Sequence, residues 1–223
     1  MSFVFLMAVV VGLPWMSYIS NKNMSALEAL PAETELARIP LYFQSAVMQI
    51  GVALLAWGTA VNEKIEVPLA SAFTLPAILG AGALISVGII FSWLDLRSKK
   101  QHEVSSGRLQ YILPTNTKEK IAWLITIAIA AFCEEYIYRG VLFQLIQVDS
   151  GMHALIAAAL SAIVFGFGHA TQGERAVLII IPFALLFQLV VYLSGGLLLA
   201  MITHFIYNAM VDVLFSKKIR ARH

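Results

Sequence analysis

Seven apolar runs alternate with polar segments along the chain, and each run is long enough for a helix that crosses or nearly crosses a membrane. Several runs contain a proline or a few glycines, which membrane helices tolerate. The two longest polar segments cover residues 21–40 and 95–120. The predicted spans are Phe3–Ile19, Leu41–Val61, Leu69–Leu94, Ile121–Ile146, His153–Ala170, Ala176–Leu193 and Leu197–Phe215.

The basic residues are distributed unevenly over the polar segments. If the N-terminus lies outside, every Lys and Arg in these segments except Lys64 lies inside, and Arg139 falls within a span. Cytoplasmic segments of membrane proteins carry such an excess. The pattern therefore predicts an N-terminus outside and a C-terminus in the cytoplasm. No Lys or Arg precedes the first run, which disfavours a cleaved signal peptide.

The composition agrees with this picture. Hydrophobic residues make up 60% of the 223 residues, whereas soluble domains are about 45–50% apolar. We expect an all-α, polytopic integral membrane protein with about seven transmembrane helices, forming a single membrane domain over 1–223. Within it, 1–117 would hold N-terminal helices and a basic cytoplasmic loop, and 118–215 the catalytic core helices. A net charge of +2 gives no indication of a nucleic-acid partner, and one cysteine excludes an intramolecular disulfide.

The fourth predicted span contains three charged residues. Glu134, Glu135 and Arg139 follow thirteen uncharged residues, Ile121–Cys133. A charge at the centre of a membrane helix costs roughly 2.5–3.5 kcal/mol, so charged residues there usually mark a functional site. The alternative is a buried polar network that only holds helices together.

Helical geometry separates the roles of these residues. Glu135 and Arg139 are spaced i,i+4 with the acid first, which favours an ion pair. Glu134 is turned about 100° from Glu135, so its carboxylate faces a different neighbour. We therefore assign a structural role to the Glu135–Arg139 pair and a chemical role to Glu134.

Two histidines, His169 and His204, fall within or at the end of predicted spans. His204, Asn208 and Asp212 recur on one face of the last span, and such a polar stripe faces the bundle interior or a wet cavity. Counting about 1.5 Å of rise per residue places His169 near the inner edge, well below Glu134. Contact between the two would require the fifth span to extend further than predicted.

A carboxylate with two imidazoles is a recurrent set for activating water. In one arrangement Glu134, His169 and His204 bind Zn²⁺; in the other the carboxylate is a general base and polar groups donate to the oxyanion. The chain lacks His-Glu-x-x-His, Gly-x-Ser-x-Gly and paired intramembrane aspartates. The residues therefore leave open whether a metal is required.

Three short motifs occur in order, each on its own span. They are Glu-Glu-x-x-x-Arg at 134–139, Phe-x-x-x-His at Phe165 and His169, and His-x-x-x-Asn at His204 and Asn208. Together they resemble the CPBP family of CAAX-prenyl-protease-type and bacteriocin-processing intramembrane proteases, also called the Abi family. The resemblance covers roughly residues 118–213.

The resemblance implies roles for these residues. Glu134 would activate the attacking water, and His169 would help to orient it. His204 and Asn208 would stabilise the oxyanion, or His204 would join His169 as a metal ligand. Glu135 and Arg139 would hold the site together.

We therefore expect an intramembrane endopeptidase in a prokaryotic plasma membrane, with an active-site cavity that faces the cytoplasm. Its substrate would be a lipidated, amphipathic or membrane-bound peptide or protein. One alternative is an ion-coupled transporter that relays charge through Glu134, His169 and Asp212. Another is a non-catalytic immunity or scaffold membrane protein.

Overall fold

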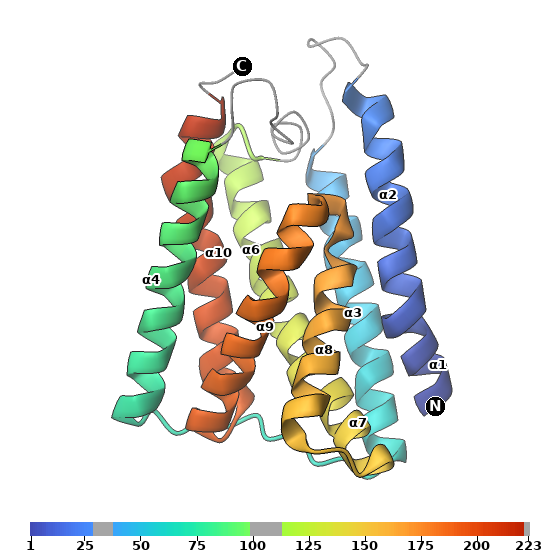
Figure 1. Ribbon diagram of the computed structural model, residues 1–223. Coiled ribbons are helices and arrows are strands. Elements are labelled where there is room, and N and C mark those ends of the chain that lie inside the picture. Colours follow the sequence, from blue (N-terminus) through green and yellow to red (C-terminus); the bar gives the residue numbers. More distant parts are fainter. Residues whose placement is uncertain (29–37, 99–112, 221–223) are drawn as a thin grey trace.

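The computed structural model of the chain describes residues 1–28, 38–98 and 113–220. All regular elements in these ranges are helices, which run up and down beside one another (Figure 1). Five of the described helices are long and apolar enough to cross a membrane, and Ala154–Gly168 and Leu197–Asp212 are shorter apolar helices. The prediction of an all-α membrane protein is confirmed, and these helices correspond to the seven apolar runs. The orientation of the bundle and the number of crossings stay predictions.

The first helix is continuous but changes character along its length. It consists of α1 (Ser2–Leu6), the π-helical η1 (Met7–Gly12) and α2 (Leu13–Glu28). The π-helical turns lie just before Pro14, which lacks the N–H of a regular turn, so the helix continues through the proline. The helix continues to Glu28, into the polar segment that begins at residue 21, where Ala-Leu-Glu at 26–28 favours helix.

The second and third spans are α3 (Arg38–Asn62) and α4 (Leu75–Ser98). The prediction that the third span begins at Leu69 is wrong. Residues 65–74, which we call the strap, have no helical structure and cross to α4 at the end of the bundle where the chain begins (Figure 1). An apolar composition alone does not distinguish a helix from a packed extended segment.

The strap is non-helical because its backbone bonds to other elements. The Pro68 carbonyl accepts from Leu197 N–H at 2.9 Å and the Leu69 carbonyl accepts from Leu198 N–H at 3.0 Å. The strap thus satisfies N–H groups in the first turn of α10, which have no partner within that helix. Ala72 N–H in turn donates to the Ser194 carbonyl at 2.7 Å.

The remaining elements form the other half of the bundle. The longest helix comprises α6 (Thr117–Glu134), the π-helical η2 (Glu135–Leu142) and α7 (Phe143–Ser150). It begins four residues before the predicted span because Asn116 Oδ1 accepts from Glu119 N–H at 2.9 Å and caps it. The others are α8 (Ala154–Gly168), the 3₁₀ turn η3 (Ala170–Gln172), α9 (Glu174–Ser194) and α10 (Leu197–Arg220).

Gly196 is required where the strap crosses the α9–α10 turn. A Cβ atom at this position would lie 1.9 Å from the Ala70 carbonyl oxygen. We predict that Gly196→Ala lowers the free energy of unfolding by about 1–3 kcal/mol, because the strap must move to relieve the overlap. Thermal unfolding in detergent measures the change.

The matched control is Gly82→Ala on α4, where an added Cβ meets nothing within 4 Å. Alanine is the better helix former, so this variant should unfold at the wild-type temperature or above it. Equal stability of Gly196→Ala and wild type would contradict the packing of the strap described above.

Candidate active site

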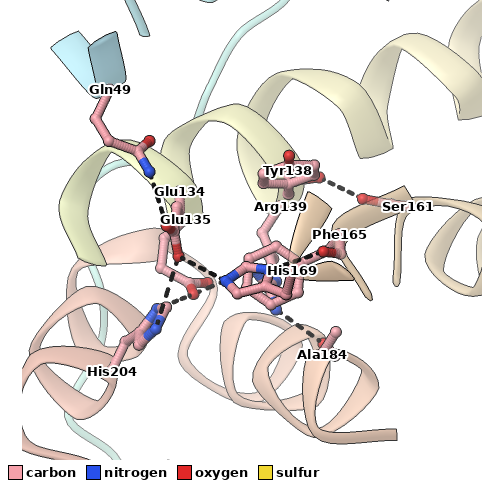
Figure 2. A network of polar contacts seen from close by, with 10 residues as sticks. All are labelled: Gln49, Glu134, Glu135, Tyr138, Arg139, Ser161, Phe165, His169, Ala184 and His204. Carbon is pink, nitrogen blue, oxygen red and sulfur yellow. Dashed lines mark hydrogen bonds and ion pairs between the residues drawn. The ribbon is translucent and has the colours of Figure 1, made fainter. Parts of the chain in front are cut away.

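The charged cluster lies where the α6 helix becomes π-helical. Glu134 is the last residue of α6, and Glu135 and Arg139 belong to η2. A π-helical turn leaves carbonyl groups without their usual i+4 partner, and such turns occur frequently at functional sites. Here the Ser161 hydroxyl of α8 donates to the Tyr138 carbonyl at 2.7 Å. Packing against α8 therefore supports the widened turn that presents the cluster (Figure 2).

Glu135 and Arg139 form the i,i+4 ion pair that their spacing predicts. Arg139 Nη1 lies 3.2 Å from Glu135 Oε1, and both side chains are almost completely buried. The guanidinium lies over the Phe165 ring, 4.2 Å from its centroid. Its Nη2 donates to the Ala184 carbonyl of α9 at 3.5 Å. The pair joins η2 to α8 and α9 in a site from which water is largely excluded.

His204 of α10 is held by the same carboxylate. Its Nδ1 lies 2.8 Å from Glu135 Oε1, and the carboxylate can only accept, so Nδ1 carries the proton and donates. This hydrogen bond fixes the ring orientation and turns Nε2 towards Glu134 Oε2, 3.8 Å away. The Phe187 ring packs against the imidazole with centroids 5.0 Å apart.

His169 is held in the same way as His204, by a hydrogen bond from Nδ1, but its acceptor is a backbone carbonyl. It is the C-cap of α8, and its Nδ1 lies 2.8 Å from the Phe165 carbonyl oxygen, to which it donates. Its Nε2 then faces Glu134 Oε2 at 4.0 Å. In the neutral tautomer, each imidazole therefore turns the lone pair of Nε2 towards the same carboxylate oxygen (Figure 2).

Glu134 has a different partner on each of its two oxygens. Oε1 accepts a hydrogen bond from Gln49 Nε2 of α3 at 2.9 Å. Oε2 faces the two imidazoles at distances too long for direct hydrogen bonds. The Glu134 side chain is 11% exposed, so a small molecule between these three groups would be shielded from bulk solvent.

The structure brings His169 to Glu134 without lengthening the fifth span. The helix α8 ends at Gly168, close to the predicted end, and has only 15 residues. It ends inside the bundle, short of the upper ends of α2, α3 and α4 (Figure 1). The depth count from the sequence was wrong because it started every span at one common plane.

The three polar residues of the stripe on α10, His204, Asn208 and Asp212, lie in different surroundings. Asp212 accepts a hydrogen bond from the Trp123 indole of α6, and it takes no part in the cluster around Glu134. Asn208 lies one turn after His204 and is half-buried, and no hydrogen bond joins it to the cluster within the described chain. Of the candidate residues, five form the cluster and Asn208 lies beside it.

Sequence reasoning missed Gln49, Phe187 and the Ala184 carbonyl. Gln49 carried a usable signal, because a polar residue inside an apolar span usually has a functional or bonding partner. The other two had none: Phe187 is one of several aromatic residues in its span, and any residue provides a carbonyl. Only the tertiary packing shows that these two groups contact the cluster.

Arg139 also lines a cavity of about 390 Å³. Residues of the strap, η2, α7 and α9 line it, and they include three glutamines. Glu134, His169 and His204 do not line it. This cavity is therefore separate from the surface that the two imidazoles and Glu134 present to one another.

The three predicted zinc ligands have suitable chemistry but not suitable spacing. Both imidazoles donate from Nδ1 to an acceptor, which is typical of zinc-binding histidines. Two ligand atoms on one tetrahedral zinc ion lie about 3.4 Å apart, whereas Glu134 Oε2 lies 3.8 and 4.0 Å from the two Nε2 atoms. Within the described ranges, no group of three or more His, Cys, Asp or Glu residues is arranged to hold a metal ion. As they stand these residues do not form a metal centre, and nothing here tests whether Zn²⁺ is required.

Comparison with known proteins finds one family that is similar to part of the chain. Residues 116–210 match the family described as type II CAAX prenyl endopeptidase, Rce1-like. This segment is similar to that CAAX endopeptidase family over less than half of the chain. The matched range contains Glu134, Glu135, Arg139 and both histidines of the cluster, whereas Gln49 lies outside it. No curated protein and no solved structure matches the chain.

The CAAX endopeptidase match confirms the resemblance inferred from the three motifs. It supports an intramembrane endopeptidase of the CAAX type in general, and the apolar helices agree with an integral membrane protein. The polar cluster thus lies within the segment that matches a protease family. This favours a catalytic role for the cluster over a purely structural one.

The Glu135–Arg139 pair gives a stability prediction. Arg139→Met leaves the Glu135 carboxylate buried without its cation, so the free energy of unfolding should fall by about 3–5 kcal/mol. The double variant with Glu135→Gln removes both charges and should recover part of this loss. Unfolding in detergent, followed by circular dichroism, measures both changes.

Arg175→Met on the exposed start of α9 is the matched control, and its effect should stay within about 0.5 kcal/mol. A wild-type stability for Arg139→Met would show that the pair does not hold the bundle together.

Proposed function

We propose that the protein hydrolyses a peptide bond of a lipidated, amphipathic or membrane-bound peptide, with Glu134 as the general base for the attacking water. The observation that carries the proposal is the convergence of His169 Nε2 and His204 Nε2 on Glu134 Oε2 at 4.0 and 3.8 Å. These distances are too long for direct hydrogen bonds and suit one bridging water.

The distances define how a water would sit. Two hydrogen bonds of about 2.8 Å span 4.0 Å when they meet at about 90° on the water oxygen. One water hydrogen would point to Glu134 Oε2 and the other to the lone pair of His169 Nε2. A lone pair of the water oxygen is then free to attack a carbonyl carbon.

The step proceeds by general base catalysis. As the water oxygen bonds to the carbonyl carbon, one O–H bond breaks and the proton passes to Glu134 Oε2. The carbonyl electron pair moves onto oxygen and forms the oxyanion. When the C–N bond breaks, the proton on Glu134 passes to the leaving amine, and the carboxylate is restored.

His204 is the group best placed to stabilise the oxyanion. Its Nδ1–H donates to Glu135, so Nε2 donates as well only when the ring carries a second proton. With Glu134 and Glu135 ionised and Arg139 charged, the cluster has one net negative charge, which this proton would balance. Asn208, one turn further along α10, would supply a second donor once substrate draws its amide towards the site.

The surroundings suit a substrate with an apolar part. The reacting groups lie inside a helical bundle whose outer surface is apolar, and large side chains such as Phe43, Trp57 and Leu54 are exposed on α3. A lipid tail or amphipathic helix can reach such a bundle sideways through the bilayer, whereas a soluble peptide cannot. We propose that the site opens towards the cytoplasm of a prokaryotic plasma membrane, in line with the orientation predicted from the basic residues.

The base assignment makes a direct prediction. Glu134→Gln keeps the acceptor for Gln49 but cannot take a proton, so the rate of cleavage should fall by about 10²–10⁴-fold while the protein stays folded. The protein is purified and reconstituted into liposomes, and its rate of cleavage of lipidated and unlipidated peptides is measured. Glu174→Gln, an exposed acid on α9, is the matched control and should cleave at the wild-type rate. Full activity of Glu134→Gln would contradict the proposal.

The metal question is tested by chelation. Because the spacing of the ligand atoms does not suit zinc, dialysis against a strong chelator should leave the cleavage rate within about twofold of the untreated enzyme. Loss of cleavage that added Zn²⁺ restores would instead establish a metallopeptidase in which the three side chains move together.

A further inference from the structure

We infer that Gln49, in the N-terminal half of the chain, is a positioning residue that assigns different roles to the two oxygens of Glu134. The inference rests on the proposed function, because it concerns the carboxylate that acts there as the base. Gln49 Nε2 donates to Glu134 Oε1 at 2.9 Å, while Oε2 faces the two imidazoles (Figure 2).

The chemistry of the pair fixes its orientation. An ionised carboxylate only accepts hydrogen bonds, so the amide must turn its NH₂ group towards Oε1. With Oε1 engaged, the carboxylate cannot rotate freely about its last bond. Oε2 is thereby kept in the direction of His169 and His204.

Gln49 lies in a row of small residues along α3. Positions 42, 46, 49, 53, 56 and 60 repeat at intervals of four and three residues, and all except Tyr42 and Gln49 are alanine. Ala46, Ala56 and Ala60 are buried. Small side chains at this spacing let two helices approach closely, and α3 packs directly against α6. The close approach brings a glutamine side chain within reach of Glu134.

The contact is held in register by others along the same helix pair. Tyr42 of α3 packs on Trp123 of α6 with ring centroids 5.0 Å apart. Arg38 lies 3.8 Å from Glu119 at the start of α6. These contacts hold Gln49 and Glu134 at the same height along the helix pair.

The test uses Gln49→Met, which keeps the length of the side chain and removes the donor. Without the hydrogen bond Glu134 Oε2 is misplaced at the moment of attack, so kcat for peptide cleavage should fall by about 10–100-fold. KM should stay within about threefold, because Gln49 does not hold the substrate. Gln44→Met, exposed on the same helix, is the matched control and should leave both constants unchanged.

A merely structural role predicts a different result. It would lower the unfolding temperature and leave kcat per folded molecule at the wild-type value, which would overturn the inference. A rise in KM with unchanged kcat would overturn it too. If Gln49→Met does not fold, Gln49→Asn decides: its shorter amide cannot reach Oε1, so a reduced kcat supports the inference and a wild-type kcat refutes it.

One double variant, together with the single variants above, separates this inference from the proposed function. In the Glu134→Gln background, Gln49→Met should lower any remaining rate by less than twofold, because there is no base to position. If wild type cleaves and Gln49→Met matches it, only the inference fails. If Glu134→Gln cleaves at the wild-type rate, the proposed function fails whatever the behaviour of Gln49.

Discussion

The fold depends on one buried ion pair. Glu135 and Arg139 are almost completely removed from solvent, and each would cost several kcal/mol if left alone. Their attraction is supplemented by the Phe165 ring and the Ala184 carbonyl on one side and by His204 on the other. Because these partners come from α8, α9 and α10, none of the three helices can slide along η2 without exposing a charge. The pair thus fixes where His204 Nε2 points.

The geometry around Glu134 follows from that arrangement. One acid of the Glu-Glu dipeptide is tied into the ion pair, and the other stays at the end of α6 with one oxygen free of protein donors. Each imidazole uses Nδ1 to hold itself in place, which leaves Nε2 for chemistry. The α3 helix completes the arrangement, although the family match begins only at residue 116. The cluster is therefore assembled from both halves of the chain.

Local rules explain what could be predicted from the sequence. Apolar runs identified the helices, and the i,i+4 rule identified the Glu135–Arg139 pair, because both features depend on residues close in the chain. The strap was mistaken for helix because its backbone partners lie on α10, more than a hundred residues away. The depth of His169 was misjudged because α8 is a short helix that ends inside the bundle. Gln49 stood out as a polar residue inside an apolar span, but its partner Glu134 lies 85 residues away, so the sequence did not show which group it bonds to.

The central claim is that Glu134 Oε2 and the two Nε2 atoms converge on one solvent molecule. The most direct test is an experimental density map of the protein in lipid, at a resolution that shows ordered water. We expect a single peak within about 3 Å of Glu134 Oε2 and of His169 Nε2, with His204 Nε2 beside it. Side chains that face separate compartments, with no site for a shared water or ion, would contradict it.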